Sequence, residues 1–231
     1  MDQMELWRGK LARKASRMVF DQAEPATDSP CSWFGRITLG EPDEDWPRSK
    51  RRPMWPLLQI VVAELPVRPA ALDGIALVRV YIDPKFYKRD TDHGQGWEVR
   101  ASPTLEGLER IAEPKHGSKI WARRGRWELI EPDYPTSDDL PADFPETMRD
   151  DYYDLGCENQ YGTKVGGWPS NIQSEIWWAP WNKHPYNPEY VFQIDSDEEN
   201  VNWMWGDAGV GYSGRGTGEH RDRWAMSWQC H

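Results

Sequence analysis

Apolar residues in this chain fall into short runs that are bounded by glycine, proline and acidic residues. The clearest runs of the first half are Leu57–Leu65 and Ile75–Ile82, and Asp83-Pro84 closes the second of them. Runs of this length that are rich in β-branched residues predict buried strands. The 19 Pro and 19 Gly add many turns, which favours short strands over long helices.

The stretch Glu189–Tyr212 has the densest pattern of the second half. It reads as an apolar strand, an acidic connection over Asp195–Asn200, the ring pair Trp203-Met-Trp205, a glycine turn and a second strand. The acidic connection is expected at the surface, because charges are buried only with partners. Glycines beside bulky rings predict a tight turn with close backbone packing, which begins at Gly206.

The first 22 residues follow a helical period instead. Met4, Trp7, Leu11, Ala15 and Met18 recur at spacings of three and four, which predicts an amphipathic helix over residues 1–22. Basic residues lie on its opposite face. We expect this helix to pack on the body of the protein, and docking on a membrane surface or a partner is the rarer alternative.

The two halves carry similar features in the same order, which predicts two related β-units packed about a pseudo-twofold axis. A chance match of short apolar strands is the competing account. The matched segments are Pro56–Glu64 with Glu189–Asp197, Gln59 with Gln193, Phe34-Gly35 with Gly166-Gly167, and Ala76–Tyr81 with Ala208–Tyr212.

We therefore expect an α+β fold that is mainly antiparallel β and roll-like, with an N-terminal helix. A single domain would cover residues 1–231, with a first β-unit at 32–84 and a second at 155–231. Between them, residues 85–154 form a middle segment that ends in an acidic connection. From Glu131 to Asp154, nine acidic residues face one arginine, and four prolines break any long helix there.

Composition and net charge limit the kinds of core and of partner that this chain can have. The chain contains 15 Trp although its mean hydropathy is only −0.84, so large rings must supply much of the buried area. The net charge of −10 argues against direct nucleic-acid binding and suits a basic partner, although acidity that serves solubility alone is the alternative.

Three widely spaced cysteines, Cys31, Cys157 and Cys230, predict no disulfide framework and fit reduced thiols in a cytoplasm. No apolar run suggests a signal peptide or a membrane span, so we expect no membrane association.

Catalytic and metal-binding patterns are weak. The acidic run that starts at Asp195 lacks the glycine and glutamate of a calcium loop. A Cys157–His184 pair has no recognisable oxyanion element, and Gly209–Gly214 fits G-x-G-x-x-G but precedes no helix. We predict no catalytic residue, no metal and no cofactor.

The more serious enzyme option is a sugar site in which carboxylates flank aromatic rings. Its residues would be Asp195, Asp197 and Asp207 with Trp203 and Trp205. The competing reading makes the two tryptophans part of the core.

Several motifs occur in order along the chain, namely Ser32–Gly35, Trp46-Pro47, Pro56–Ile60, Lys164–Pro169, Phe192–Asp197, Met204–Gly209 and Trp228–Cys230. Together they resemble the YwqG-like family of bacterial proteins of unknown function. The resemblance implies a β-rich single-domain roll with a few helices and no established reaction. It also implies a setting beside secreted-toxin genes, where some relatives look like immunity proteins.

The leading hypothesis is a non-catalytic immunity protein that binds a cognate toxin with a basic surface, such as a nuclease. Acidic side chains would steer association and aromatic anchors would supply affinity. The alternative is a small-ligand or carbohydrate-binding protein, or an enzyme, that uses the Trp/Asp-rich face. The expected toxin-binding residues are Asp138, Asp139, Asp143, Asp150, Asp151, Trp178, Trp181, Asp197, Glu198 and Glu199.

Overall fold

The computed structural model describes residues 3–20, 30–86, 93–150, 152–176, 178 and 184–231. Its N-terminal helix α1 covers only Gln3–Leu11, and the strand β1 follows at Arg13–Phe20. The prediction of one helix over residues 1–22 is therefore wrong beyond Leu11. Tertiary pairing overrides the local period here, because β1 lies in mid-sheet with a hydrogen-bonded strand on each side.

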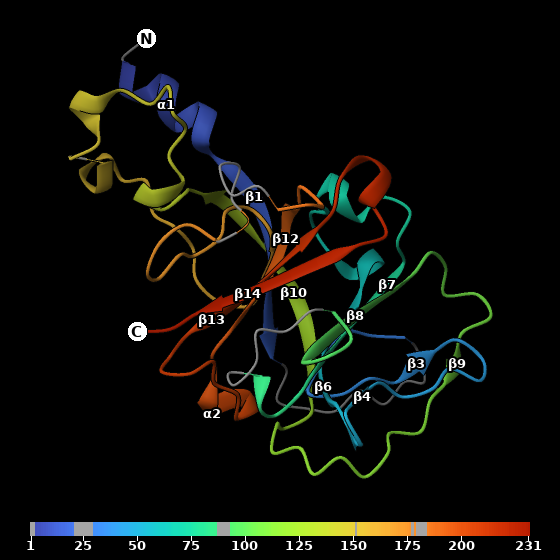
Figure 1. Cartoon of the computed structure of the whole chain (residues 1–231). Helices are drawn as coiled ribbons and strands as arrows, with labels where there is room; N and C mark the ends of the chain where they lie inside the picture. The colour runs from blue at the N-terminus through green and yellow to red at the C-terminus, as the bar shows by residue number, and fades with distance from the viewer. Residues whose placement is uncertain (1–2, 21–29, 87–92, 151, 177, 179–183) are drawn as a thin grey trace.

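Ten strands form one antiparallel sheet in the order β14-β13-β12-β11-β1-β10-β2-β6-β7-β8. This sheet curls into a nearly closed, barrel-like roll (Figure 1), which confirms the mainly antiparallel α+β prediction. Its other strands are β2 (Trp33–Phe34), β6 (Trp55–Val61), β7 (Leu77–Ile82), β8 (Trp97–Ser102), β10 (Arg123–Asp133), β11 (Lys164–Gly166), β12 (Glu189–Asp195), β13 (Val210–Arg215) and β14 (Trp224–Gln229).

Short elements lie in the connections. Two small ladders pair β3 (Leu39–Gly40) with β9 (Glu109–Arg110) and β4 (Arg48–Ser49) with β5 (Arg52–Pro53). The remaining elements are α2 (Glu198–Val201) and the 3-10 helices η1 (Val62–Glu64), η2 (Ala70–Leu72), η4 (Ser137–Asp139), η5 (Glu146–Met148), η6 (Tyr152–Leu155) and η7 (Gly218–His220). Among the described residues, no helix is long and apolar enough to cross a membrane.

The sheet order reads the same from both edges, which supports the predicted repeat. A pseudo-twofold axis between β1 and β10 relates β2, β6, β7 and β8 to β11, β12, β13 and β14. The two inner strands are exchanged between the halves. Strand β1, from the start of the chain, pairs with β11 of the second unit, and β10 pairs with β2 of the first. The four strands of the first unit thus continue to Ser102, beyond the segment assigned to that unit from the sequence.

Two glutamines mark equivalent points of the repeat. Gln59 Oε1 accepts from Thr38 N at 2.9 Å and its Nε2 donates to Cys31 O at 2.8 Å. In the second half, Gln193 Oε1 accepts from Ser170 N at 2.8 Å and its Nε2 donates to Gly162 O at 2.9 Å. Each buried glutamine side chain therefore holds together the loop before and the loop after the short strand that it faces.

Strand register refines the match between the halves. Gln59 pairs with Trp33 and Gln193 pairs with Lys164, so Phe34-Gly35 corresponds to Val165-Gly166, one residue earlier than the sequence comparison suggests. The same register irregularity falls three residues before each glutamine, between Pro56 and Leu58 and between Tyr190 and Phe192. A shared bulge is a strong sign of a common plan, because bulges are specific structural features.

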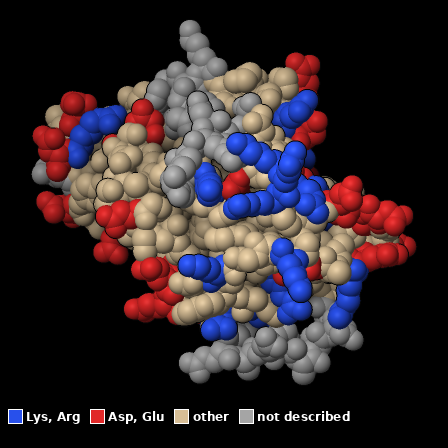
Figure 2. Space-filling model, turned by 60° about the horizontal axis from the view of Figure 1, so that its bottom comes forward, with Lys and Arg blue, Asp and Glu red and all other residues tan. Residues whose placement is uncertain are grey.

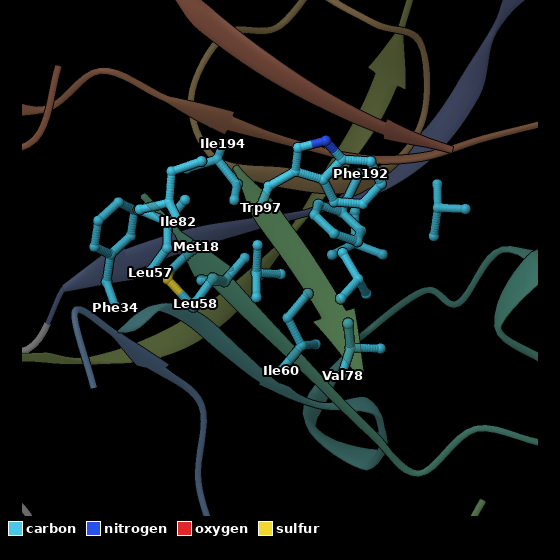
Figure 3. Packing of buried hydrophobic residues seen from close by; sticks show 14 of the residues in the cluster. Met18, Phe34, Leu57, Leu58, Ile60, Val78, Ile82, Trp97, Phe192 and Ile194 are labelled. Carbon is cyan, nitrogen blue, oxygen red and sulfur yellow. The ribbon is translucent and has the colours of Figure 1, made fainter. Parts of the chain in front are cut away.

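The main core lies inside the roll and draws on both halves. Figure 3 shows Phe192 and Ile194 converging with Leu58 and Ile60 in one apolar cluster. Trp205 is wholly buried in the same cluster. The opposite face of the sheet, which carries Gln59 and Gln193, is covered by loops.

Candidate functional site

A small lobe stands apart from the roll at the N-terminal end of the molecule (Figure 1). We call α1 together with residues 134–158 the acidic lobe. Its own apolar cluster holds it together, with Trp7 and Leu11 of α1 packed against Phe144 and Tyr152. The rings of Trp7 and Phe144 meet edge to face at 5.2 Å. The four prolines of the connection and its short 3-10 turns leave the carboxylates on the outside of this cluster.

Charge is strongly one-sided in residues 137–158 of the lobe, whereas α1 adds Glu5, Arg8 and Lys10. Among the described residues 137–158, seven carboxylates face a single arginine, Arg149, which pairs with Glu146 at 3.1 Å. Asp138, Asp143 and Asp150 are exposed. Figure 2 shows acidic side chains gathered at the two ends of the visible face, with Lys and Arg between them. The molecule is thus divided into regions of opposite charge despite its overall acidity.

One member of the predicted acidic surface is not at the surface at all. Asp133 is fully buried, and Lys164, equally buried, donates to its Oδ2 at 3.0 Å. The backbone N–H groups of Gln160 and Trp168 add bonds of 2.9 and 2.8 Å to the same carboxylate. This site anchors the loop below the lobe, because a buried charge is stable only when its bonds are satisfied.

The predicted toxin-binding residues separate into distant groups. Asp138, Asp139, Asp143 and Asp150 lie on the acidic lobe, whereas Asp151 and Trp181 fall outside the described residues. Asp197, Glu198 and Glu199 lie at α2, far from the lobe in Figure 1. Asp197 serves there as the N-cap of α2 and accepts from Asn200 N at 2.9 Å.

Trp178 is not an exposed anchor, because it is only 4% exposed. It lines a pocket of about 600 Å³ between the lobe and the second β-unit. We call this the lobe pocket. Its lining residues are Arg13, Asp139, Trp168, Pro169, Ile176, Trp178, Asn187, Pro188, Glu189 and Tyr190.

Three charged residues line the lobe pocket, namely Arg13, Asp139 and the exposed Glu189. The Arg13 guanidinium lies over the Trp168 ring at 3.3 Å, and Trp168 Nε1 donates to Leu11 O at 2.7 Å. Asn171 Nδ2 donates to Asp139 Oδ2 at 2.8 Å. Burial raises the pKa of Asp139 from 3.8 to about 6, against the opposing effects of Asn171 and Arg13. A carboxyl group that changes charge near pH 6 beside a fixed guanidinium is typical of a binding site.

The raised pKa of Asp139 predicts a pH-dependent stability. Its proton is held more tightly in the folded state, so the ionised carboxylate lowers stability above pH 6, and this cost fades as the pH falls towards 3.8. D139N should raise the free energy of unfolding by about 2 to 3 kcal/mol at pH 7.5 and by almost nothing at pH 4. Urea denaturation at both pH values measures this difference.

D143N is the matched control, since Asp143 is exposed on the same lobe. Its effect on stability should be small and equal at the two pH values. A gain for D139N that is the same at pH 4 and pH 7.5 would show that folding does not raise the pKa of Asp139.

The Trp/Asp-rich face is not arranged as a sugar site. Trp203 and Trp205 are 4% and 0% exposed and pack at 5.1 Å from each other in the main core. Ser196 holds the turn that follows them, accepting from Trp205 N at 2.9 Å and donating to Gly209 O at 2.7 Å. The reading of these rings as core is confirmed, because buried rings offer no face to a sugar.

Sequence reasoning missed Arg13, Trp168 and Tyr190 as pocket residues. Arg13 was placed within the long predicted helix, and Trp168 was noted only as part of the motif Lys164–Pro169. Their approach joins segments about 155 residues apart, and no local pattern predicts it. The motif Lys164–Pro169 was the available sign of a pocket residue, because glycines before Trp168 let other chain segments approach its ring.

Comparison with known proteins gives a family without a function. A search of curated proteins finds no match. Residues 32–213 match the family described as a domain of unknown function, DUF1963. The match begins at the strand β2 and ends within β13, so it covers most of both pseudo-symmetric units and residues 134–158 of the lobe, but not β1 or β14. The chain therefore belongs to the DUF1963 family.

Proposed function

We propose that this chain is a non-catalytic binding protein that docks its acidic lobe on the basic surface of a partner protein. The observation that carries the proposal is the charge of the lobe, where Glu5 and seven described carboxylates of residues 137–158 outnumber Arg8, Lys10 and Arg149. Charge of one sign on a protruding surface steers a partner of opposite sign and speeds association.

The partner that fits best is a secreted bacterial toxin, with this chain as its immunity protein. Toxins that act on nucleic acids present basic surfaces because their substrates are anionic. The YwqG-like motifs, and the neighbourhood with secreted-toxin genes that they imply, support the same role. The three cysteines are unpaired, which suits action in the reducing cytoplasm.

Co-expression with the toxin encoded beside this chain tests the proposal. The complex should co-purify, and cells that make both proteins should grow. The variant D138K/D143K/D150K replaces three exposed carboxylates of the lobe and should slow association roughly tenfold or more. Growth protection should fall with it.

The matched control is E106K/E198K/E199K, which changes the net charge equally at exposed positions away from the lobe. It should bind and protect like the parent protein, and it also decides whether α2 takes part. Equal losses in the two variants would mean that total charge, and not the lobe, governs binding. Absence of any complex with the neighbouring toxin would refute the immunity role.

A further inference from the structure

The lobe pocket has features that protein docking on the acidic lobe does not require. Arg13 Nη1 donates to Gly167 O at a long 3.4 Å, and no described carboxylate is in ion-pair contact with this guanidinium. Its Cζ lies 3.3 Å from the centroid of the Trp168 ring, and both residues line the pocket. A guanidinium held in this way is prepared for an anionic group, and a carboxylate matches its paired donors.

Asp139 supplies the opposite charge across the same pocket. Its Oδ2 accepts from Asn171, and within the described chain its Oδ1 has no hydrogen bond. Asp139 and Arg13 sense each other electrostatically without direct contact. Two opposite charges that line one pocket and do not meet leave room for a ligand that joins them.

Apart from Asn187 and Glu189, the other residues that line the pocket are largely apolar. Pro169, Ile176, Trp178 and Pro188 line the pocket, and the Tyr190 hydroxyl is tied to Gln193 Oε1 at 3.3 Å. Burial raises the pKa of Tyr190 well above its usual value, so its ring stays neutral. An apolar ligand group would therefore lie against these residues while the charged groups take the two ends.

The equivalent place in the first half is closed. Register makes Gly214, opposite Tyr190, the counterpart of Tyr81, opposite Pro56. The Tyr81 ring fills that space with Trp46 at 5.1 Å, and the pocket there measures about 180 Å³. Arg100 in this smaller pocket is already paired with Glu44 at 2.8 Å. In the second half this place is taken by Pro188 and Trp178, which an added Cβ at Gly214 would meet at 3.1 Å, while Arg13 and Asp139 stay apart.

We propose that the lobe pocket binds a small zwitterion of the α-amino acid class with an apolar side chain. Its carboxylate meets Arg13, its ammonium meets Asp139, and its side chain lies against Ile176 and Trp178. The site shares Asp139 with the acidic lobe, but its test uses free amino acids and so can fail without touching the proposed docking on a partner.

Isothermal titration of the full chain with the twenty L-amino acids at pH 7.5 tests the site. An apolar member such as leucine or phenylalanine should bind. The analogues that lack one charge, 4-methylvalerate and isoamylamine for leucine or 3-phenylpropionate and phenethylamine for phenylalanine, should bind at least tenfold more weakly. Affinity should also fall below pH 6, as Asp139 takes up its proton.

R13Q and D139N each keep a planar polar group and should each weaken binding at least tenfold. R123Q is the matched control, because Arg123 also lies beside a tryptophan, 5.8 Å from the Trp121 ring, but on an exposed surface. It should bind like the parent protein. The proposal is overturned if no amino acid binds, if a singly charged analogue binds as well as the zwitterion, or if R13Q and D139N keep full affinity.

Discussion

Replacing Asp133 by alanine should lower the free energy of unfolding by about 3 to 5 kcal/mol. The substitution leaves the Lys164 ammonium buried without its counter-charge and removes the acceptor of two backbone N–H groups. Burial already lowers the pKa of Lys164, and the negative charge of Asp133 opposes that shift. The pair also ties the strand β10 to β11 across β1, at the centre of the ten-stranded sheet.

A double-mutant cycle measured by urea denaturation shows whether charge pairing is the cause. K164M alone should also be costly, because it leaves the Asp133 carboxylate buried without its cation. D133A/K164M contains neither of these two buried charges. Its loss of unfolding free energy should therefore be smaller than the sum of the two single losses, by about 2 kcal/mol or more. Additive losses would mean that packing, and not the ion pair, sets the cost.

Replacing Trp205 by alanine is expected to cost about 3 to 5 kcal/mol of unfolding free energy. The ring is fully buried and meets the Phe86 ring at 4.8 Å. It also lies flat against Gly211, where an added Cβ would come within 2.3 Å of the indole. No neighbour could refill this space without moving the backbone of β13.

Two control variants test whether the cost of W205A comes from the burial of Trp205. In the described chain, Trp205 Nε1 has no hydrogen-bond partner, so W205F gives up no bond and should cost much less than W205A. W121A, at a residue that is 46% exposed, should change stability by about 0.5 kcal/mol or less. Thermal or urea denaturation measures all three, and equal effects for Trp205 and Trp121 would contradict the burial of Trp205.

Much of the fold could be predicted because its strands are locally encoded. The run at Leu57–Leu65 contains most of β6, and Ile75–Ile82 contains β7. Gln59 and Gln193 were matched from sequence alone, and they make the same pair of loop contacts. The turn at Gly206 has the positive φ of 61° that favours glycine. The strands and the turn depend on neighbours in the sequence, and the two glutamines were matched because each lies in a similar apolar run.

Features that depend on distant partners could not be predicted. Strand β1 has apolar residues that fit a helical period equally well, and only pairing with Leu129 and Val165, which lie opposite Ser16, makes it a strand. Asp133 looked like one more exposed acid until its partner Lys164 was placed beside it. The lobe pocket arises in the same way, because its charges come from segments far apart in the chain.

The association rate with the proposed toxin partner tests most directly whether the acidic lobe is a docking surface. Stopped-flow mixing over a range of salt concentrations should show a fast rate for the parent protein that falls steeply as salt screens the charges. E106K/E198K/E199K should follow the same curve, whereas D138K/D143K/D150K should be slow and nearly insensitive to salt. A lobe variant that associates as fast as the parent protein at low salt would contradict the account.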